Sequence, residues 1–294
     1  MRTRVRRGLI RLLRLGLVLY VLVAAVLFSL QTRIIFPGSA TQGDPSAVVR
    51  PRPGEELVRL KTAQGDSIVA LFGPALRADG VIDPQAAHQP TVLYFYGNGM
   101  CLRDTDDEFQ RLRRLGFNVL IPEYAGYGMS GGSAGESGCI ATADAAYDHL
   151  LTRKDVDPAR IVAAGWSLGG AVAIDLAARR PVAGLVSFCT FTSLPDMARR
   201  DFPFLPARLL LRHRFDNASK IARVTCPILL GHGRRDELIP FAMSDRLAAL
   251  ARSPVTRLTI DDAGHNDFYD AGGQRVFEAV RRFVEGLPAS KGSP

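Results

Sequence analysis

The chain has 294 residues, 47% of them hydrophobic, and a formal net charge of +8. This length and apolar content suffice to bury the core of one large α/β domain. Six of the eight charges come from a basic N-terminal run, and no motif for reading nucleic acid accompanies them, so we expect no nucleic-acid partner. The run consists of Arg2, Arg4, Arg6, Arg7, Arg11 and Arg14.

The N-terminal segment is long and apolar enough to cross a membrane. Residues 1–14 predict a basic cytoplasmic tail, and residues 15–30, which carry no charge, predict a transmembrane anchor. A helix that begins near Gly8 would reach about 34 Å by Leu30, which spans a bilayer. A cleaved signal peptide is an alternative, with Gly38-Ser39-Ala40 as a poor cleavage site, and a buried soluble helix is another.

The positions of the positive charges predict the orientation of this anchor. Arginines flank its N-terminal end, and the positive-inside rule keeps such a flank in the cytoplasm. We therefore expect a single-pass membrane protein whose C-terminal domain lies on the exported, periplasmic or extracytoplasmic side.

Residues 31–54 carry four prolines and read as a lead-in, after which strands and helices alternate. Near-continuous apolar strands separated by helices indicate a mainly parallel sheet covered on both faces. We therefore predict one α/β domain over residues 55–288, an eight-stranded sheet, and a short tail at 289–294. The expected strands are 56–62, 67–72, 91–96, 117–121, 161–166, 182–188, 227–230 and 257–260, and the expected helices include 104–115, 136–153, 168–179 and 272–285.

The pattern Gly-x-Ser-x-Gly occurs three times, centred on Ser130, Ser133 and Ser167. A nucleophile elbow needs a strand, one strained residue and then a helix. Ser167 alone has this context, since an apolar strand ends at Trp166 and a helical run begins at Leu168. The other two serines lie in a glycine-rich loop, so we predict Ser167 as the nucleophile.

A serine nucleophile needs a base, and the base needs an orienting acid. In this architecture both follow the serine, the acid first. His265 follows the last strand in a short turn and is the predicted base, whereas His88 and His149 precede the serine, and we expect packing or structural roles for His213 and His232. Asp236, in the loop after the preceding strand, is the predicted acid; we expect Glu237, Asp261 and Asp262 to be exposed charges.

Two backbone N–H groups should stabilise the oxyanion that develops on a substrate carbonyl. One is that of Leu168, directly after the nucleophile, and the other should come from the loop "YGNG" at residues 96–99, with Asn98 as the donor. Cys101, Cys139, Cys189 and Cys226 show no zinc-binding spacing, so we expect neither metal nor cofactor. We expect the cysteines to be small buried residues, with a disulfide left open for an exported domain.

In their order and spacing, these motifs resemble the α/β-hydrolase superfamily, specifically its Bem46-like branch of membrane-anchored serine hydrolases. The similarity spans most of residues 31–285. It includes "QTRIIFP", "YGNG", "PEYAGYGMSGG", "GWSLGG", "RFDN", "CPILLGHGRRDELIP" and "AGHND". Two positions depart from the family: Tyr96 stands where relatives usually have His, and Glu123-Tyr124-Ala125 replaces the usual Asp-Tyr-Arg.

The resemblance implies an α/β-hydrolase fold with a small cap over residues 191–223, whose "FPFLPARLLL" stretch either lines an acyl pocket or packs on the sheet. It implies a membrane-anchored serine hydrolase that cleaves carboxylic ester, thioester or lipid acyl bonds through an acyl-enzyme, with a small-molecule or lipid acyl substrate. A serine peptidase of the same fold, or a non-catalytic membrane-tethered binding protein, is the alternative.

Overall fold

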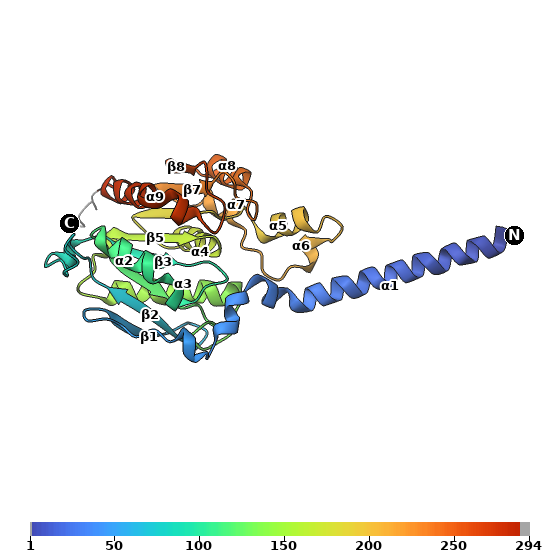
Figure 1. The fold of residues 1–294 in the computed structure, drawn as a ribbon, viewed down its shortest axis with the longest axis horizontal. Helices are drawn as coiled ribbons and strands as arrows, with labels where there is room; N and C mark the ends of the chain where they lie inside the picture. The colour runs from blue at the N-terminus through green and yellow to red at the C-terminus, as the bar shows by residue number, and fades with distance from the viewer. Residues whose placement is uncertain (1, 289–294) are drawn as a thin grey trace.

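The computed structural model describes residues 2–288; the predicted tail at 289–294 lies outside the described residues. Eight strands form one sheet in the order β1-β2-β4-β3-β5-β6-β7-β8 (Figure 1). The pairs β1–β2 and β2–β4 are antiparallel and every later pair is parallel, which confirms the predicted fold class. The strands are β1 Glu56–Lys61, β2 Ser67–Gly73, β3 Thr91–Phe95, β4 Asn118–Pro122, β5 Ile161–Trp166, β6 Gly184–Phe188, β7 Ile228–Gly233 and β8 Val255–Ile260.

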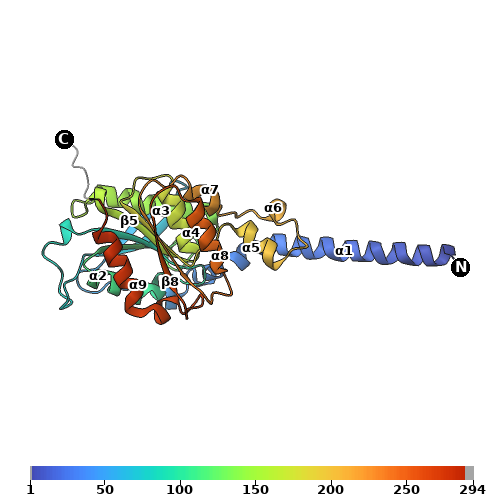
Figure 2. The same ribbon diagram turned by 90° about the horizontal axis from the view of Figure 1, so that it is seen from above.

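Helices cover both faces of the sheet, as parallel strands joined by crossovers require. Figure 2 shows α2 and α9 on one face and α3, α4, α7 and α8 on the other. The helices are α1 Arg2–Ile35, α2 Asp106–Arg114, α3 Glu136–Thr152, α4 Leu168–Ala177, α5 Leu194–Asp201, α6 Ala207–Leu210, α7 Asn217–Ile221, α8 Phe241–Leu250 and α9 Phe268–Glu285. Short 3-10 turns occupy Pro37–Thr41, Pro45–Ala47, Ala86–His88, Leu102–Thr105 and Pro158–Arg160.

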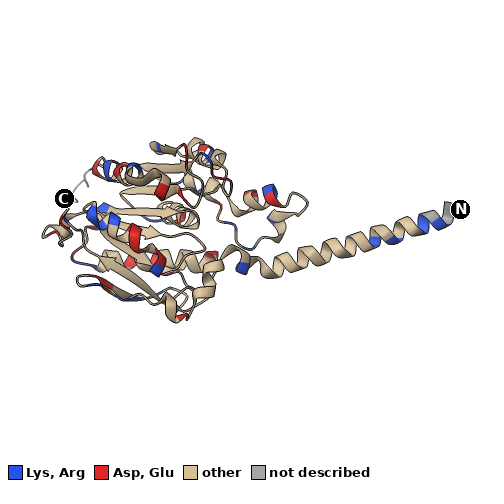
Figure 3. Cartoon of the chain, in the orientation of Figure 1, with Lys and Arg blue, Asp and Glu red and all other residues tan. Residues whose placement is uncertain are grey.

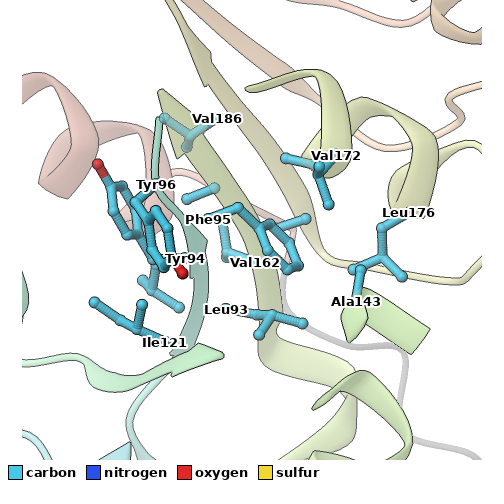
Figure 4. Packing of buried hydrophobic residues seen from close by; sticks show 14 of the residues in the cluster. Leu93, Tyr94, Phe95, Tyr96, Ile121, Ala143, Val162, Val172, Leu176 and Val186 are labelled. Atoms are coloured by element: carbon cyan, nitrogen blue, oxygen red, sulfur yellow. The ribbon is translucent and has the colours of Figure 1, made fainter. Parts of the chain in front are cut away.

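The core lies between the central strands and α3 and α4. Successive residues of β3 point to opposite faces of the sheet, so Leu93 and Phe95 lie on one side, toward Val172 and Leu176 of α4, while Tyr94 lies on the other (Figure 4). Every residue of β3, β4 and β6 is buried. Buried central strands hold the loops at the carboxyl edge of the sheet in fixed positions, and the predicted site residues lie in those loops.

The N-terminal helix differs from the prediction in its length. The expected anchor covered residues 15–30 and the expected lead-in began at 31, but α1 is continuous to Ile35 and the lead-in starts only there. The most apolar 18-residue window of Arg6–Ile35 has a mean hydropathy of 2.4 and none of it is buried, so α1 is a candidate membrane-spanning helix. Figure 3 shows the basic residues of α1 gathered near its N-terminal end, apart from Arg33 in its last turn.

The small cap consists of α5, α6 and the loops around them. Figures 1 and 2 both place it between the sheet and α1, beside the part of α1 nearest the domain. The cap therefore packs on the apolar helix rather than on the sheet alone. All four cysteines lie within the described residues and are buried and free.

Candidate active site

Ser167 occupies the strained turn that the sequence predicted. It links β5 to α4 with φ 57° and ψ −119°, a region that L-residues rarely adopt. Neighbouring glycines permit this turn: a Cβ on Gly169 would lie 1.9 Å from the carbonyl oxygen of Phe95, and one on Gly165 would lie 2.2 Å from that of Gly169. The strain, about 1–3 kcal/mol for such a residue, holds the hydroxyl at the sheet edge.

The structure brings the three predicted side chains into contact in series. His265 Nε2 lies 2.9 Å from Ser167 Oγ, and its Nδ1 lies 2.7 Å from Asp236 Oδ2. A carboxylate only accepts hydrogen bonds, so Nδ1 carries the proton and Nε2 is free to accept from the serine hydroxyl. Asp236 follows β7 and His265 follows β8, adjacent parallel strands. The geometry suits proton transfer from serine to histidine.

Asp236 is held as an ionised acceptor by three donors. The backbone N–H of Ile239 donates to Oδ1 at 2.7 Å, while His265 and His232 approach Oδ2, His232 at 3.1 Å. Burial would raise the Asp236 pKa, but hydrogen bonds from His232, His265 and Ile239 outweigh it and lower the pKa to about 2. The carboxylate therefore stays charged and can stabilise a protonated His265.

His232 supports the acid loop. Its Nε2 lies 2.8 Å from the carbonyl oxygen of Ile239 as well as near Asp236. Both neighbours are acceptors, so Nε2 is the protonated nitrogen. A potential metal-binding group of Cys189, His232 and Asp236 exists, but burial raises the pKa of the Cys189 thiol well above its ordinary value. A protonated thiol is a poor metal ligand, and Asp236 is already committed to its three donors.

The remaining acids and histidines lie elsewhere. Asp261 and Asp262 are exposed and pair with Arg234 and Arg235, respectively, and Glu237 is exposed. His213 packs at the base of α1, with Nε2 3.0 Å from Thr32 Oγ1. The serines of the other two Gly-x-Ser-x-Gly matches do not contact His265 or Asp236 in the described residues. Ser133 is exposed, and the Ser130 hydroxyl donates to the Glu123 carbonyl oxygen at 3.0 Å.

The predicted oxyanion loop is fixed by the chain segment that follows α1. The Asn98 side-chain amide donates to the Ile35 carbonyl oxygen at 2.9 Å, and the Asn98 carbonyl accepts from Gly38 N–H and the Tyr127 hydroxyl, both at 3.0 Å. The Asn98 side chain is therefore structural. Among hydrogen bonds of the described residues, the backbone N–H groups of Asn98 and Leu168 have no acceptor, as an oxyanion hole requires.

Trp166 is a site residue that sequence reasoning missed. Its ring lies against the His265 imidazole, with the centroids 5.0 Å apart and the planes at 35°. The indole also meets the predicted oxyanion loop, because a Cβ on Gly97 would lie 2.4 Å from it. The only sequence signal was its place directly before Ser167. Trp166 thus contacts both His265 and the predicted oxyanion loop.

Comparisons with known proteins agree with this architecture. A sequence model of the alpha/beta hydrolase family matches residues 95–219. An uncharacterized protein of Mycobacterium tuberculosis is 34% identical over 88% of this chain and 88% of its own length. The alpha/beta hydrolase domain-containing protein 17B of Xenopus tropicalis is 30% identical over 80% of this chain and 77% of its own length.

Solved structures share the fold. The esterase Pf2001 of Pyrococcus furiosus aligns with a TM-score of 0.66 at 18% identity, over 82% of this chain and 97% of its own. A puromycin-hydrolyzing peptidase of Mycobacterium tuberculosis aligns with a TM-score of 0.61 at 20% identity, over 82% of this chain and 41% of its own. Fold, motif order and relatives together place this chain in the α/β-hydrolase family, in its Bem46-like branch.

Proposed function

We propose that this α/β hydrolase is a serine hydrolase that cleaves carboxylic ester, thioester or lipid acyl bonds. The observation that carries the proposal is the unbroken series Ser167–His265–Asp236, at 2.9 Å and 2.7 Å. The esterase neighbours support acyl transfer to water. The reaction class is therefore hydrolysis through a covalent acyl-enzyme.

In the proposed mechanism, Ser167 Oγ attacks the acyl carbonyl carbon while His265 Nε2 takes the hydroxyl proton. The carbonyl electron pair moves to oxygen, and the N–H groups of Asn98 and Leu168 stabilise the oxyanion. His265 then protonates the leaving alcohol or thiol as the carbon–heteroatom bond breaks. Water, deprotonated by His265, hydrolyses the acyl-enzyme and returns the proton to Ser167. Asp236 keeps the imidazole oriented and balances its transient charge.

A covalent probe tests this proposal directly. A fluorophosphonate should label the wild-type chain and Ser133→Ala but not Ser167→Ala. Ser133 is the matched control because it lies in another Gly-x-Ser-x-Gly match and is exposed. We expect p-nitrophenyl ester hydrolysis to fall by about 10³-fold or more in Ser167→Ala. Retained labelling of Ser167→Ala would refute the nucleophile assignment.

Two alternatives predict other outcomes. The puromycin-hydrolyzing peptidase with the same fold favours testing amide substrates beside esters, and faster amide than ester turnover would assign peptidase activity. A folded chain that neither reacts with the probe nor hydrolyses either class would instead be a non-catalytic binding protein. The intact series of hydrogen bonds supports catalysis over that alternative.

We further propose that α1 anchors the catalytic domain on the exported side of the membrane. The supporting observation is the apolar window of Arg6–Ile35 with basic residues at its N-terminal end. A reporter that is active only in the cytoplasm, fused to the C-terminus, should be silent. An active reporter would reverse the orientation, and full release of the chain by carbonate washing would exclude an anchor.

A further inference from the structure

We propose that the cavity between α1 and the cap holds the acyl chain of a substrate drawn from the surrounding bilayer. This inference rests on the proposed hydrolase function and assigns its substrate class. The cavity has a volume of about 200 Å³. Leu27, Phe28 and Ile34 line it from α1, and Met197, Phe202 and Leu205 line it from the cap.

The lining suits a hydrocarbon chain. Nearly all of its side chains are apolar, and Asp201 is the one charged residue among the described residues around the cavity. Gln31, the polar residue on the α1 wall, is buried and already satisfied: its Oε1 accepts from Arg212 N–H at 2.8 Å, and its Nε2 donates to the Phe28 carbonyl oxygen at 2.8 Å. A polar ligand would therefore find few partners in this cavity.

Specific contacts fix the cap on the apolar helix. The Tyr20 hydroxyl donates to the Phe204 carbonyl oxygen at 3.0 Å, and the Arg212 guanidinium lies 5.0 Å from the centroid of the Phe28 ring. Tyr20 precedes the end of α1 at Ile35 by fifteen residues, about 22 Å along a helix. If α1 spans a bilayer, the part of the cap around Phe204 (residues 202–209, the cap tip) lies within the same bilayer.

The cap tip carries the side chains that such a position requires. Phe202, Phe204 and Leu209 are 42%, 59% and 84% exposed. In water these apolar surfaces would be unfavourable, whereas lipid would cover them. Arg208 lies between Phe204 and Leu209 in the sequence and is exposed, and its long side chain can extend toward the headgroups. The cavity thus opens among lipid chains, which makes a lipid acyl chain its natural occupant.

One residue of the cavity wall contacts the predicted oxyanion loop. Ile35 lines the cavity, and the Ile35 carbonyl accepts the hydrogen bond of the Asn98 amide in the oxyanion loop. One residue therefore belongs to the cavity wall and anchors the loop that would stabilise the reacting carbonyl. A chain bound in the cavity can place its ester or thioester group beside that loop.

The test compares chain lengths on the full-length protein in lipid nanodiscs. Leu27→Trp and Ala198→Trp fill the cavity from opposite walls. Leu22→Trp is the matched control, because Leu22 lies on α1 with 57% exposure and outside the cavity lining. We expect both cavity variants to lower kcat/KM for p-nitrophenyl palmitate by about tenfold or more, whereas their kcat/KM for p-nitrophenyl acetate should stay within about twofold of wild type. The control variant Leu22→Trp should stay within about twofold of wild type on both esters. Equal losses on both esters, or no loss, would overturn the proposal.

A binding measurement separates this proposal from the hydrolase function. In Ser167→Ala nanodiscs, a photoreactive palmitic acid should crosslink to peptides covering residues 27–35 and 197–211. Labelling of these peptides should fall in the added Leu27→Trp background and persist with Leu22→Trp. Crosslinking as expected without any esterase activity would refute the function and keep the cavity assignment. Esterase activity of the wild-type chain, together with labelling that Leu27→Trp does not reduce, would support the hydrolase function and refute the cavity assignment.

Discussion

The Tyr96 hydroxyl donates a hydrogen bond to Glu123 Oε1 across 2.7 Å, and both side chains are fully buried. These two residues are the positions at which the sequence departs from the family's usual His and Asp. These two departures therefore lie on the two sides of one contact, and the third, Ala125 in place of the usual Arg, lies two residues beyond Glu123. The Tyr96 carbonyl oxygen also accepts from the Tyr124 hydroxyl at 2.9 Å, so the pair ties the start of the oxyanion loop to the loop after β4.

The electrostatics of this pair favour a strong hydrogen bond. Burial raises the pKa of Tyr96 well above its ordinary value, so the phenol remains a donor. Burial also raises the pKa of Glu123, against the opposing effect of hydrogen bonds from Tyr96, Leu102 and Met129. A buried carboxylate with few donors depends strongly on each of them.

Tyr96→Phe should destabilise the domain and slow catalysis. It removes one donor from Glu123 and the acceptor for the Tyr124 N–H, which we expect to lower the free energy of unfolding by about 1–3 kcal/mol. Denaturant unfolding and ester kinetics check this, with a larger fall in kcat than change in KM. Tyr94→Phe is the control, because the Tyr94 hydroxyl contacts only the neutral Tyr269 hydroxyl, at 3.1 Å. A Tyr94→Phe loss as large as that of Tyr96→Phe would contradict a special role for the pair.

Gly97→Ala should impair the site, whereas Gly99→Ala in the same loop should not. The added methyl at residue 97 would meet the Trp166 indole at 2.4 Å and displace this ring, which packs against His265, but at residue 99 it meets nothing within 4 Å. We expect Gly97→Ala to lose about tenfold or more in kcat/KM, since small displacements in an active site are costly. Ester kinetics on both variants decide this, and equal activities would show that the indole moves away freely.

The positions of the strands and the convergence of Ser167, Asp236 and His265 could be predicted from sequence because their signals are local. An apolar strand, a glycine-flanked serine and a helical run mark Ser167 without knowledge of the remainder. Asp236 and His265 follow adjacent strands, and parallel strands bring their carboxyl ends to one edge of the sheet. The physical reason for success is that backbone topology, rather than side-chain detail, places these three groups.

What escaped prediction depends on contacts between distant residues. α1 continues to Ile35, where its last turns make hydrogen bonds to distant segments. Gln31 accepts from the Arg212 N–H of the cap, and the Ile35 carbonyl accepts from the Asn98 side chain. The contact of Trp166 with His265 joins residues 99 positions apart in the chain. No periodicity in the sequence encodes such pairs. The role of Tyr96 at the usual His position is likewise visible only in the structure, where its hydroxyl donates to Glu123.

His232→Ala should weaken catalysis without touching the serine or the base. The hydrogen bond from His232 is the largest of the effects that lower the Asp236 pKa, so its loss should raise that pKa and loosen the acid loop near Ile239. We expect kcat/KM to fall by about tenfold, within the range of supporting residues around active-site groups. Kinetics over a pH series measure this. The control is His88→Ala, in the 3-10 turn Ala86–His88, which should leave the pH profile of kcat/KM unchanged. If His232→Ala also leaves the profile unchanged, His232 has only a packing role.

The ionised Asp236 should stabilise the fold in a defined pH window. Burial would raise its pKa, but the hydrogen bonds to it lower the value from 3.8 to about 2. Because the folded pKa is depressed, this stabilisation is present above 3.8 and is lost as the pH falls through about 2. The difference in unfolding free energy between wild type and Asp236→Asn should therefore stay level at neutral pH and shrink from pH 4 downward, about where an unperturbed aspartate titrates. Urea unfolding at successive pH values measures it, with the exposed Glu237→Gln as a control that shows no such window. A difference that stays constant down to pH 2 would mean that the charge on Asp236 contributes nothing to folding.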